Sequence, residues 1–137
     1  MRVQVQGSAL VVLDDGDKVR WRVDLPACVA EWLLASDTAR RTLLAILGAP
    51  RFRRRLTSEG AVRSLVLLLY MRAHGQAPYK ARQVVGVSGE QLYRIERAIR
   101  EEGLYGLYRA GVDLMMRESG ARPAPRAGSQ INSRGRR

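Results

Sequence analysis

Apolar and polar residues alternate along the first 25 positions of the chain. Residues 18–25 alternate strictly, with charged side chains on one side and four apolar side chains on the other: Val19, Trp21, Val23 and Leu25. A two-residue period is typical of a half-buried strand. Residues 3–6 alternate in the same way, residues 10–13 form an apolar run, and the Asp-Gly pair after it is a common hairpin turn. These patterns predict a small N-terminal antiparallel sheet of two or three strands within residues 1–25.

From Pro26 onward, apolar residues recur with the three- and four-residue spacing of helices. Pro26, Ser36 and Ser58 stand where a helix can begin, and Gly48 and Pro50 stand where one can end. The segment from 62 to 71 is apolar nearly all round, so its helix is expected at the centre of the fold. Three helices are therefore predicted before residue 75: 27–35, 38–47 and 59–74.

The segment over residues 76–102 has two apolar periods separated by a glycine. Its apolar positions fit two short helices that cross and share a small core: Ala81, Val85, Val87, Leu92 and Ile95. Gly86 lies between them, where the turn needs a positive φ that glycine adopts at little steric cost. Ser88 follows with a hydroxyl that can cap a second helix near 89–102. The spacing predicts a helix-turn-helix whose second helix is presented to a groove of nucleic acid.

Two interpretations fit residues 103–118. Apolar residues recur there at helical spacing, which predicts an amphipathic helix that packs on a partner subunit. The sequences LYGLYR and VDLMMR could instead be the strands of a hairpin, which would be the wing of a winged helix; we favour the helix. Residues 119–137 are rich in Gly, Pro, Ser and Arg and have almost no apolar residues, so we expect a disordered basic tail.

Together these elements predict a mostly helical α+β fold, with a small N-terminal antiparallel sheet followed by about five helices. We expect one compact domain over residues 1–118, divided into a sheet, helices, the helix-turn-helix and a helix or wing: 1–25, 26–75, 76–102 and 103–118. Cys28, the single cysteine, is expected as a small buried hydrophobe in a reducing cytoplasm. No apolar run is long enough for an export signal or a membrane span, so we expect a cytoplasmic, nucleoid-associated protein with no membrane partner.

Charge indicates a polyanionic partner. The 137 residues include 24 Lys and Arg against 13 Asp and Glu, which gives a net charge of +11 and a pI near 11.1. Residues 51–82 carry eight basic side chains against Glu59 alone, and residues 119–137 carry five arginines and no acid, whereas residues 1–50 are neutral. Nearly all the basic residues are arginine, whose planar fork suits phosphates and guanine edges, although a GC-rich genome produces the same bias.

The segment 76–102 resembles the helix-turn-helix DNA-binding family. The family pattern has an alanine in the first helix, glycine-hydrophobe-serine at the turn and spaced aliphatics on the second helix, here Ala81, Gly86, Val87, Ser88, Leu92 and Ile95. The small residue normally lies four positions before the turn glycine, where this chain has Arg82, whose guanidinium must then extend out of the helix contact. The resemblance implies a regulator or organiser of duplex DNA, with contacts from Lys80, Arg82, Ser88, Gln91, Tyr93, Arg94 and Arg97. Because one helix contacts few base pairs, it also implies a homodimer, with 104–118 as the candidate interface.

Residues 51–55 support a different interpretation. One aromatic residue, Phe52, lies among four arginines: Arg51, Arg53, Arg54 and Arg55. This is the composition of a platform for single-stranded DNA or RNA, in which the ring stacks on a base and the guanidiniums follow the backbone. In its organisation the chain then resembles the archaeal single-strand binders called ThermoDBP. A second possibility is a solvated loop whose Phe52 packs into the core, and in the duplex interpretation the same arginines contact phosphates.

Catalytic chemistry has little support in the sequence. The one histidine, His74, lies far from the one cysteine and is better explained by its favourable place at the end of a helix. The three aspartates at 14–17 fit a solvated turn better than a metal site, and neither an EF-hand spacing nor a phosphate-binding glycine loop occurs. We therefore expect a non-enzymatic nucleic-acid-binding protein with no metal and no cofactor, and duplex DNA is favoured over single strands.

Overall fold

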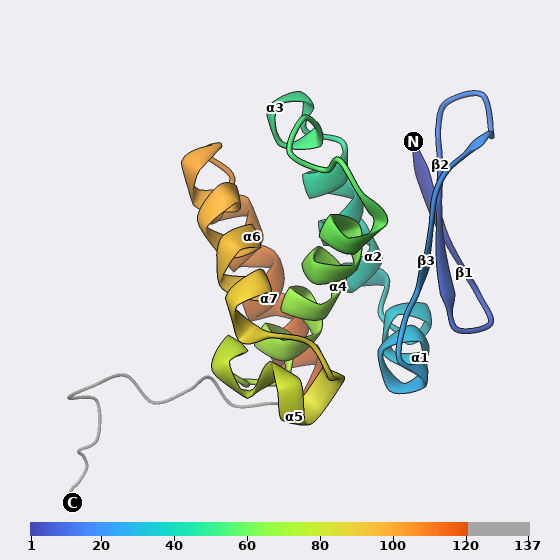
Figure 1. Cartoon of the computed structure of the whole chain (residues 1–137). Coiled ribbons are helices and arrows are strands. Elements are labelled where there is room, and N and C mark those ends of the chain that lie inside the picture. Colours follow the sequence, from blue (N-terminus) through green and yellow to red (C-terminus); the bar gives the residue numbers. More distant parts are fainter. Residues whose placement is uncertain (121–137) are drawn as a thin grey trace, which may run out of the picture.

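The computed structural model of the protein describes residues 1–120. The chain begins with a three-stranded antiparallel sheet made of β1 (Arg2–Gln6), β2 (Ala9–Leu13) and β3 (Val19–Asp24), with β2 in the middle (Figure 1). All five residues of β2 are buried, because this strand has a neighbour on each side and its Leu10 and Val12 join the core of the helices. The sheet predicted from the alternation is confirmed.

A bulge at Arg20 interrupts the alternation along β3. Val12 pairs with Trp21, and the next residue of β2, Leu13, pairs with Val19, so β3 has one extra residue. Val12 and Leu13 are neighbours on β2, so their side chains point to opposite faces of the sheet. Their partners on β3, Trp21 and Val19, therefore also point to opposite faces. Trp21 packs against the core, whereas Val19 is 62% exposed. The prediction that Val19 shares the buried side of the strand is therefore wrong.

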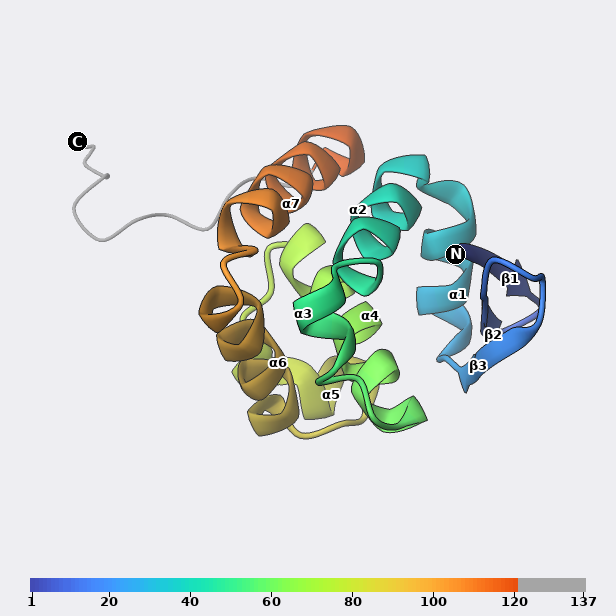
Figure 2. The same ribbon diagram turned by 90° about the horizontal axis from the view of Figure 1, so that it is seen from above.

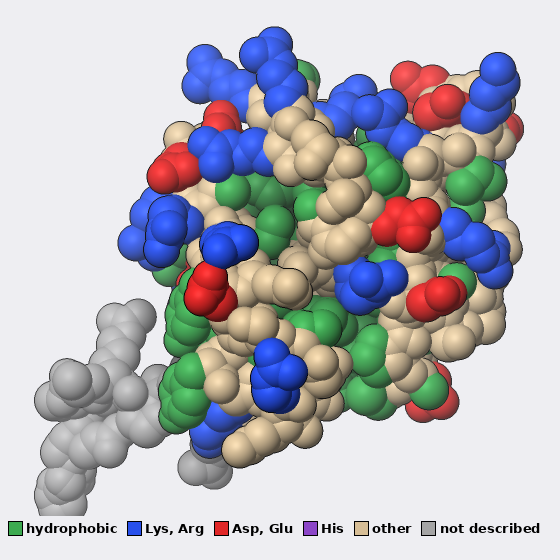
Figure 3. All heavy atoms as spheres, viewed as in Figure 1, with side chains coloured by type: hydrophobic (Ala, Val, Ile, Leu, Met, Phe, Trp, Pro, Cys, Tyr) green, Lys and Arg blue, Asp and Glu red, His purple; other side chains and the backbone are tan. Residues whose placement is uncertain are grey.

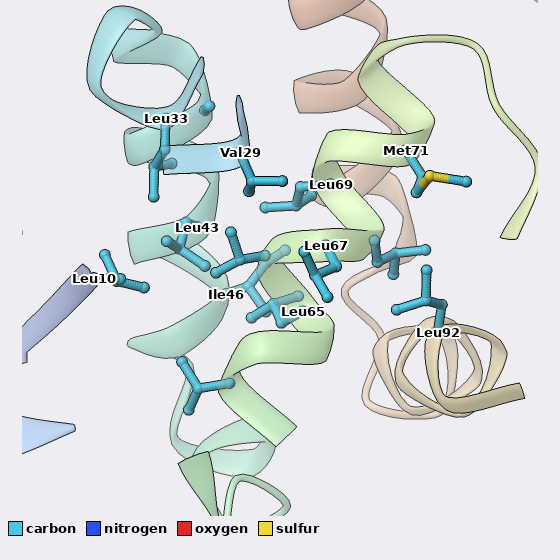
Figure 4. Close-up of a cluster of buried hydrophobic side chains, with 14 of the residues drawn as sticks. Leu10, Val29, Leu33, Leu43, Ile46, Leu65, Leu67, Leu69, Met71 and Leu92 are labelled. Atoms are coloured by element: carbon cyan, nitrogen blue, oxygen red, sulfur yellow. The ribbon is translucent and has the colours of Figure 1, made fainter. Parts of the chain in front are cut away.

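Within residues 1–120, seven α-helices and one short 3-10 helix follow the sheet. They are α1 (Ala27–Ala35), α2 (Asp37–Leu47), α3 (Pro50–Arg53), α4 (Glu59–Ala73), η1 (Pro78–Lys80), α5 (Ala81–Val85), α6 (Gly89–Glu101) and α7 (Tyr105–Ser119). Figure 2 shows α4 enclosed by the other helices, and residues 65–69 of α4 are all fully buried. In Figure 4 the leucines of α4 meet side chains from α2 on one side and from α6 on the other. The central position predicted for this helix is confirmed.

Serine hydroxyls begin two helices as the sequence predicts. The Oγ of Ser36 accepts a hydrogen bond from the N–H of Ala39 at 3.0 Å, and the Oγ of Ser58 accepts one from the N–H of Ala61 at 3.2 Å. The helix α3 is an addition to the prediction. The sequence predicts Pro50 only as the end of the preceding helix, but it also begins a new one, because proline suits a first turn in which its missing N–H costs nothing.

Residues 105–119 form a helix, so the interpretation that they form a wing is wrong. Helix α7 packs on α2 and α4. Gly111 allows the close approach of α7 to α2, because a Cβ at this position would lie only 2.4 Å from Oγ1 of Thr42.

The fold is α+β and mostly helical, as predicted. Cys28 lies exposed near the start of α1 rather than in the core, because α1 turns Val29, Ala30 and Leu33 inwards instead. No helix within residues 1–120 has the length and apolar character needed to cross a membrane. The predicted basic tail lies outside the described residues from position 121 onward.

Candidate nucleic-acid interface

The turn between α5 and α6 has the geometry that its sequence predicts. Gly86 ends α5 with a φ of +78°, in the left-handed region, and its N–H donates to the carbonyl oxygen of Ala81 at 3.0 Å. Ser88 then caps α6, since its Oγ accepts a hydrogen bond from the N–H of Glu90 at 3.2 Å. Three residues thus separate the two helices, and α5 ends and α6 begins where the pattern places them.

The helices on the two sides of the turn share the small core that their spacing predicts. Its fully buried members are Ala81 and Leu92, Val85 is nearly so, and Val87 and Ile95 are partly buried against it. Arg82 is exposed. The contact between the helices is therefore made by Ala81, and the side chain of Arg82 lies in solvent, as its departure from the family pattern requires.

The backbone of α6 touches η1 at Gly89. A Cβ at this position would lie 2.4 Å from the carbonyl oxygen of Pro78 and 3.0 Å from Cα of Tyr79. Gly89 is therefore half-buried and does not face outward with its neighbours Glu90 and Gln91. Gly89 does not have a positive φ, so no local feature of the sequence marks it; only the approach of a second backbone requires a glycine here.

A polar network fixes the inner side of α6 to α4 and α7. Arg72 of α4 donates two hydrogen bonds to the carboxylate of Glu96, at 2.9 and 2.8 Å, and the hydroxyl of Tyr108 on α7 donates a third at 2.6 Å. Burial alone would raise the pKa of Glu96, but these hydrogen bonds and the charge of Arg72 outweigh it and hold this pKa below the ordinary 4.5. Burial, and then the neighbouring carboxylate, raise the pKa of Tyr108. The network leaves the opposite side of α6 facing outward.

Four of the side chains predicted to contact nucleic acid are exposed on α6: Gln91, Tyr93, Arg94 and Arg97. Ser88 is half-buried, and its hydroxyl caps the helix. Arg94 forms a 2.7 Å ion pair with Glu90, and both side chains are exposed. A surface ion pair one helical turn apart contributes only about 0.3–0.5 kcal/mol to stability. The guanidinium of Arg94 can therefore leave this carboxylate and bind a phosphate or a base. Within residues 1–120, Arg97 makes no hydrogen bond or ion pair.

A hollow of about 680 Å³ lies beside the N-terminal half of α6. It is lined by Tyr79, Gly89, Glu90, Tyr93, Arg94 and Arg97. A second hollow continues along the helix and is lined by Tyr93, Glu96, Arg97 and Arg100. The sequence interpretation missed Tyr79 and Arg100. Arg100 lies one turn beyond Arg97 and could have been found from the helical period, whereas no spacing rule links Tyr79 to α6.

The arginine-rich segment does not form the aromatic platform that the single-strand interpretation requires. Phe52 is fully buried, because α3 turns its ring into the core, and the hypothesis that it stacks on a base is wrong. The alternative, in which Phe52 packs into the core, is confirmed, although the segment is a short helix rather than a loop. Arg53 is half-buried and donates a hydrogen bond to the carbonyl oxygen of Gly48 at 3.3 Å.

Arg55 joins the end of α3 to the end of α6. Its guanidinium lies 2.9 Å from Oε1 of Glu101 and 2.7 Å from Oε2 of Glu102. Of the four arginines predicted to contact phosphates, Arg53 and Arg55 thus already bind groups of the protein itself, Arg55 at the surface. Arg51 and Arg54 are exposed, and in the described part of the chain neither makes a hydrogen bond or ion pair.

Basic side chains therefore lie near both ends of α6. Arg55 contacts the acids at the C-terminal end of α6, so the segment that carries the exposed Arg51 and Arg54 lies on that side of the molecule. Lys80 and Arg82, both exposed, precede the turn at its N-terminal end. In Figure 3, Lys and Arg side chains gather over α3 and along the side of α6, with a few acids among them. The arrangement is a polar face about 20 Å long with cations at each end.

No protein-family model, curated protein or solved structure matches this chain. In the part of the chain that the structure describes, no group of three or more His, Cys, Asp or Glu side chains is placed to hold a metal ion. The function of the site therefore has to be inferred from its geometry and chemistry.

Proposed function

We propose that the protein binds duplex DNA through α6 and catalyses no reaction. The observation that carries this proposal is the orientation of α6, which buries Leu92 and Ile99 and exposes Gln91, Arg94 and Arg97 on its other side. Figures 1 and 2 both place α6 at the edge of the molecule. A helix held this way, after a glycine turn, fits the major groove, which is about 12 Å wide.

Three exposed side chains of α6 have the chemistry that base edges require. Arg94 and Arg97 can each donate two hydrogen bonds to O6 and N7 of guanine, and Gln91 can pair with N6 and N7 of adenine. Each good bidentate contact contributes about 1–3 kcal/mol of discrimination. Glu90 can accept from N4 of cytosine once Arg94 turns to the DNA. These residues carry the sequence-dependent part of the proposed binding.

Sequence-independent affinity comes from cations beside α6. The acids of α6 leave this helix close to neutral, so attraction to phosphates depends on exposed residues outside it: Arg51, Arg54, Lys80 and Arg82. Phosphate contacts position a protein on DNA without sequence information, and they release counterions, which makes binding sensitive to salt. The five arginines of residues 122–137 lie outside the described residues and are expected to add to this attraction.

The proposal includes a homodimer formed through α7, because two copies on neighbouring half-sites contact enough base pairs to select a site. Leu107 and Leu114 are exposed and lie two turns apart on one side of α7. They border a hollow shared with α2, whose lining includes the small residues Ala45, Ala110 and Gly111. Exposed leucines seven residues apart are a pattern through which helices pair, and this surface shares no residue with the outer side of α6.

A selection from random-sequence duplex DNA tests the proposed function. The protein is mixed with the library at low salt, and the bound duplexes are recovered and sequenced. We expect enrichment of a two-fold symmetric motif, which would favour a regulator over a general DNA organiser. No retention of any duplex at low salt would contradict DNA binding.

Arg94→Ala tests the assignment of base contacts to α6. The affinity of this variant is measured for the enriched site and for random duplex. We expect the ratio of these two affinities to fall more than the affinity for random duplex. Arg109→Ala is the matched control, because Arg109 forms the same kind of surface pair, with Asp113 one turn away on α7. Equal losses of affinity on both duplexes for Arg94→Ala would rule out a base contact by this side chain.

A further inference from the structure

Within residues 1–120, two aromatic side chains are exposed, and both line the same hollow. Tyr79 of η1 is 70% exposed and Tyr93 of α6 is 38% exposed, whereas the other aromatic residues of this range are buried or half-buried. An aromatic side chain can remove about 150–250 Å² of surface from water when it is covered. Two rings left uncovered in one hollow indicate a surface that a flat ligand can cover.

The glycine contact described above brings these two rings together. Because Gly89 has no Cβ, the start of α6 lies directly against the backbone of Pro78 and Tyr79. The ring of Tyr79 therefore lies beside the first turn of α6, and Tyr93 follows one turn later on the same helix. Lys80 lies 5.9 Å from the centre of the Tyr79 ring and adds a positive charge at the edge of the hollow.

The charges in the hollow select the class of ligand. Arg94 and Arg97 line it together with the single acid Glu90, and Lys80 stands beside it. An excess of positive charge disfavours a cation, although aromatic rings alone could hold one. The same excess favours a flat aromatic ligand that carries a negative charge. A nucleotide has this composition, since its base can stack on the tyrosines while its phosphate contacts Lys80 at the edge of the hollow.

The neighbouring hollow offers similar side chains to the next nucleotide of a bound DNA strand. It shares Tyr93 and Arg97 with the first hollow and adds Arg100 and Glu96, whose carboxylate is already bound by Arg72 and Tyr108. The guanidinium of Arg100 lies 4.3 Å from the centre of the Tyr105 ring, which holds this cation at the surface. A further phosphate can therefore be bound beyond the first nucleotide.

We infer that this tyrosine hollow, formed by Tyr79, Tyr93, Arg94 and Arg97, binds an unpaired nucleotide that adjoins the duplex contacted by α6. The inference rests on the proposed function and adds a preferred DNA form to it. Inside a duplex the faces of the bases are stacked on one another, whereas an unpaired base at a strand end exposes its face to an aromatic ring. Stacking tolerates any base, so the preference is for DNA structure and not for sequence.

The test compares a blunt duplex with the same duplex carrying a three-nucleotide overhang, on the 5′ or the 3′ end, with 2-aminopurine in the overhang. We expect tighter binding of one overhang duplex, by about 10-fold, and quenching of the 2-aminopurine fluorescence as its base stacks. Tyr79→Ala is expected to bring the ratio of the affinities for overhang and blunt duplex close to one. Tyr79→Phe keeps the ring and is expected to retain the ratio of the native protein. Val84→Ala removes an exposed apolar side chain of α5 outside the hollow and should retain the ratio.

The outcomes separate this inference from the proposed function. Equal affinity for blunt and overhang duplexes overturns the inference and leaves duplex binding intact. A ratio that survives Tyr79→Ala also overturns it, because the preference would then come from another surface. If neither duplex binds, the proposed function itself fails. Circular dichroism of each variant shows whether the fold is retained.

Discussion

Two glycines three residues apart have different physical roles at the turn. Gly86 has a φ of +78°, and a Cβ added to it would meet nothing within 4 Å, so the backbone conformation is what requires glycine. Gly89 has no positive φ, but a Cβ there would lie 2.4 Å from a carbonyl oxygen, so the missing side chain is what matters. Gly86 sets the direction of α6, and Gly89 sets how closely its first turn approaches η1.

Gly89→Ala is expected to lower the free energy of unfolding by about 1–3 kcal/mol, because the added methyl forces α6 away from the backbone of Pro78. Gly106→Ala is the matched control. Gly106 lies in α7 with open space around it, so alanine there should raise this free energy by about 0.4–1 kcal/mol through the unfolded state. Urea unfolding measures the free energy of unfolding of both variants. An unchanged free energy in Gly89→Ala would contradict the close contact.

Glu96→Gln is expected to destabilise the protein by about 3 kcal/mol at neutral pH, because the partly buried guanidinium of Arg72 loses its counter-charge. Because the pKa of Glu96 is lowered by folding, its ionised form contributes stability in full above the ordinary value of 4.5. This contribution is lost as the pH falls through the lower pKa of the folded state.

Urea unfolding of the native protein and Glu96→Gln between pH 3 and 7 measures this effect. The stability gap between them should be constant near neutral pH and should narrow only below about pH 4.5. Tyr108→Phe removes the hydroxyl that donates to Glu96, so the pKa of Glu96 in the folded state should lie closer to 4.5. The stability gap between Tyr108→Phe and Tyr108→Phe/Glu96→Gln should therefore be smaller near neutral pH, and its narrowing should end at a higher pH. A gap that is independent of pH would contradict a lowered pKa of Glu96.

At the scale of elements, the short helix α3 sorts the arginines of one segment into two groups. Phe52 faces the core, Arg53 and Arg55 bind a carbonyl and two carboxylates of the protein itself, and Arg51 and Arg54 face solvent without such a partner within residues 1–120. The helix thus holds its two free cations near the end of α6, where Arg55 attaches it. The composition of the segment indicates a polyanion, but the contacts that α3 and the turn after it make with the rest of the protein decide which arginines can reach one.

The double variant Arg51→Ala/Arg54→Ala is expected to weaken binding to all duplex sequences alike. Because each phosphate contact contributes about one to the slope of log affinity against log salt, the slope should fall by about two. Titrations of a random-sequence duplex at several salt concentrations measure this slope. The control Arg41→Ala removes an exposed arginine of α2 that is paired with Asp37, and its slope should stay unchanged. An unchanged slope in the double variant would exclude α3 from the DNA contact.

The elements were largely predictable because their signals are local. The helix starts at Ser36, Ser58 and Ser88 follow from side chains that cap backbone N–H groups a few residues away. The bulge at Arg20 and the helix beginning at Pro50 were missed. A bulge depends on the register of two strands, and proline both ends one helix and begins the next, so neither has an unambiguous local sign.

At the scale of the whole molecule, the outer side of α6 and the leucines of α7 are separate surfaces. The first has three exposed polar or charged side chains suited to bases, and the second has Leu107 and Leu114 beside small residues of α2 and α7. A dimer through α7 would leave both copies of α6 uncovered. This separation allows the proposed self-association and the proposed DNA binding to be tested by different substitutions.

Leu107→Glu/Leu114→Glu is expected to convert the proposed dimer to a monomer, because two carboxylates would be buried without partners. Sedimentation velocity over a range of protein concentrations measures the change. Leu34→Glu, which alters another exposed leucine on α1, should leave the dimer intact. A native protein that sediments as a monomer at all concentrations would contradict the dimer proposal.

The sequence alone determined the class of fold, the helix-turn-helix spacing and the separation of positive charge from a neutral N-terminal part, because periodicity, caps and charge are properties of nearby residues. Tertiary structure decided which polar groups remain free. It buried Phe52, engaged Arg53 and Arg55, exposed Cys28 and brought Tyr79 beside Tyr93. The physical reason is that exposure and pairing depend on which distant segment packs against a residue, and no local pattern contains that information.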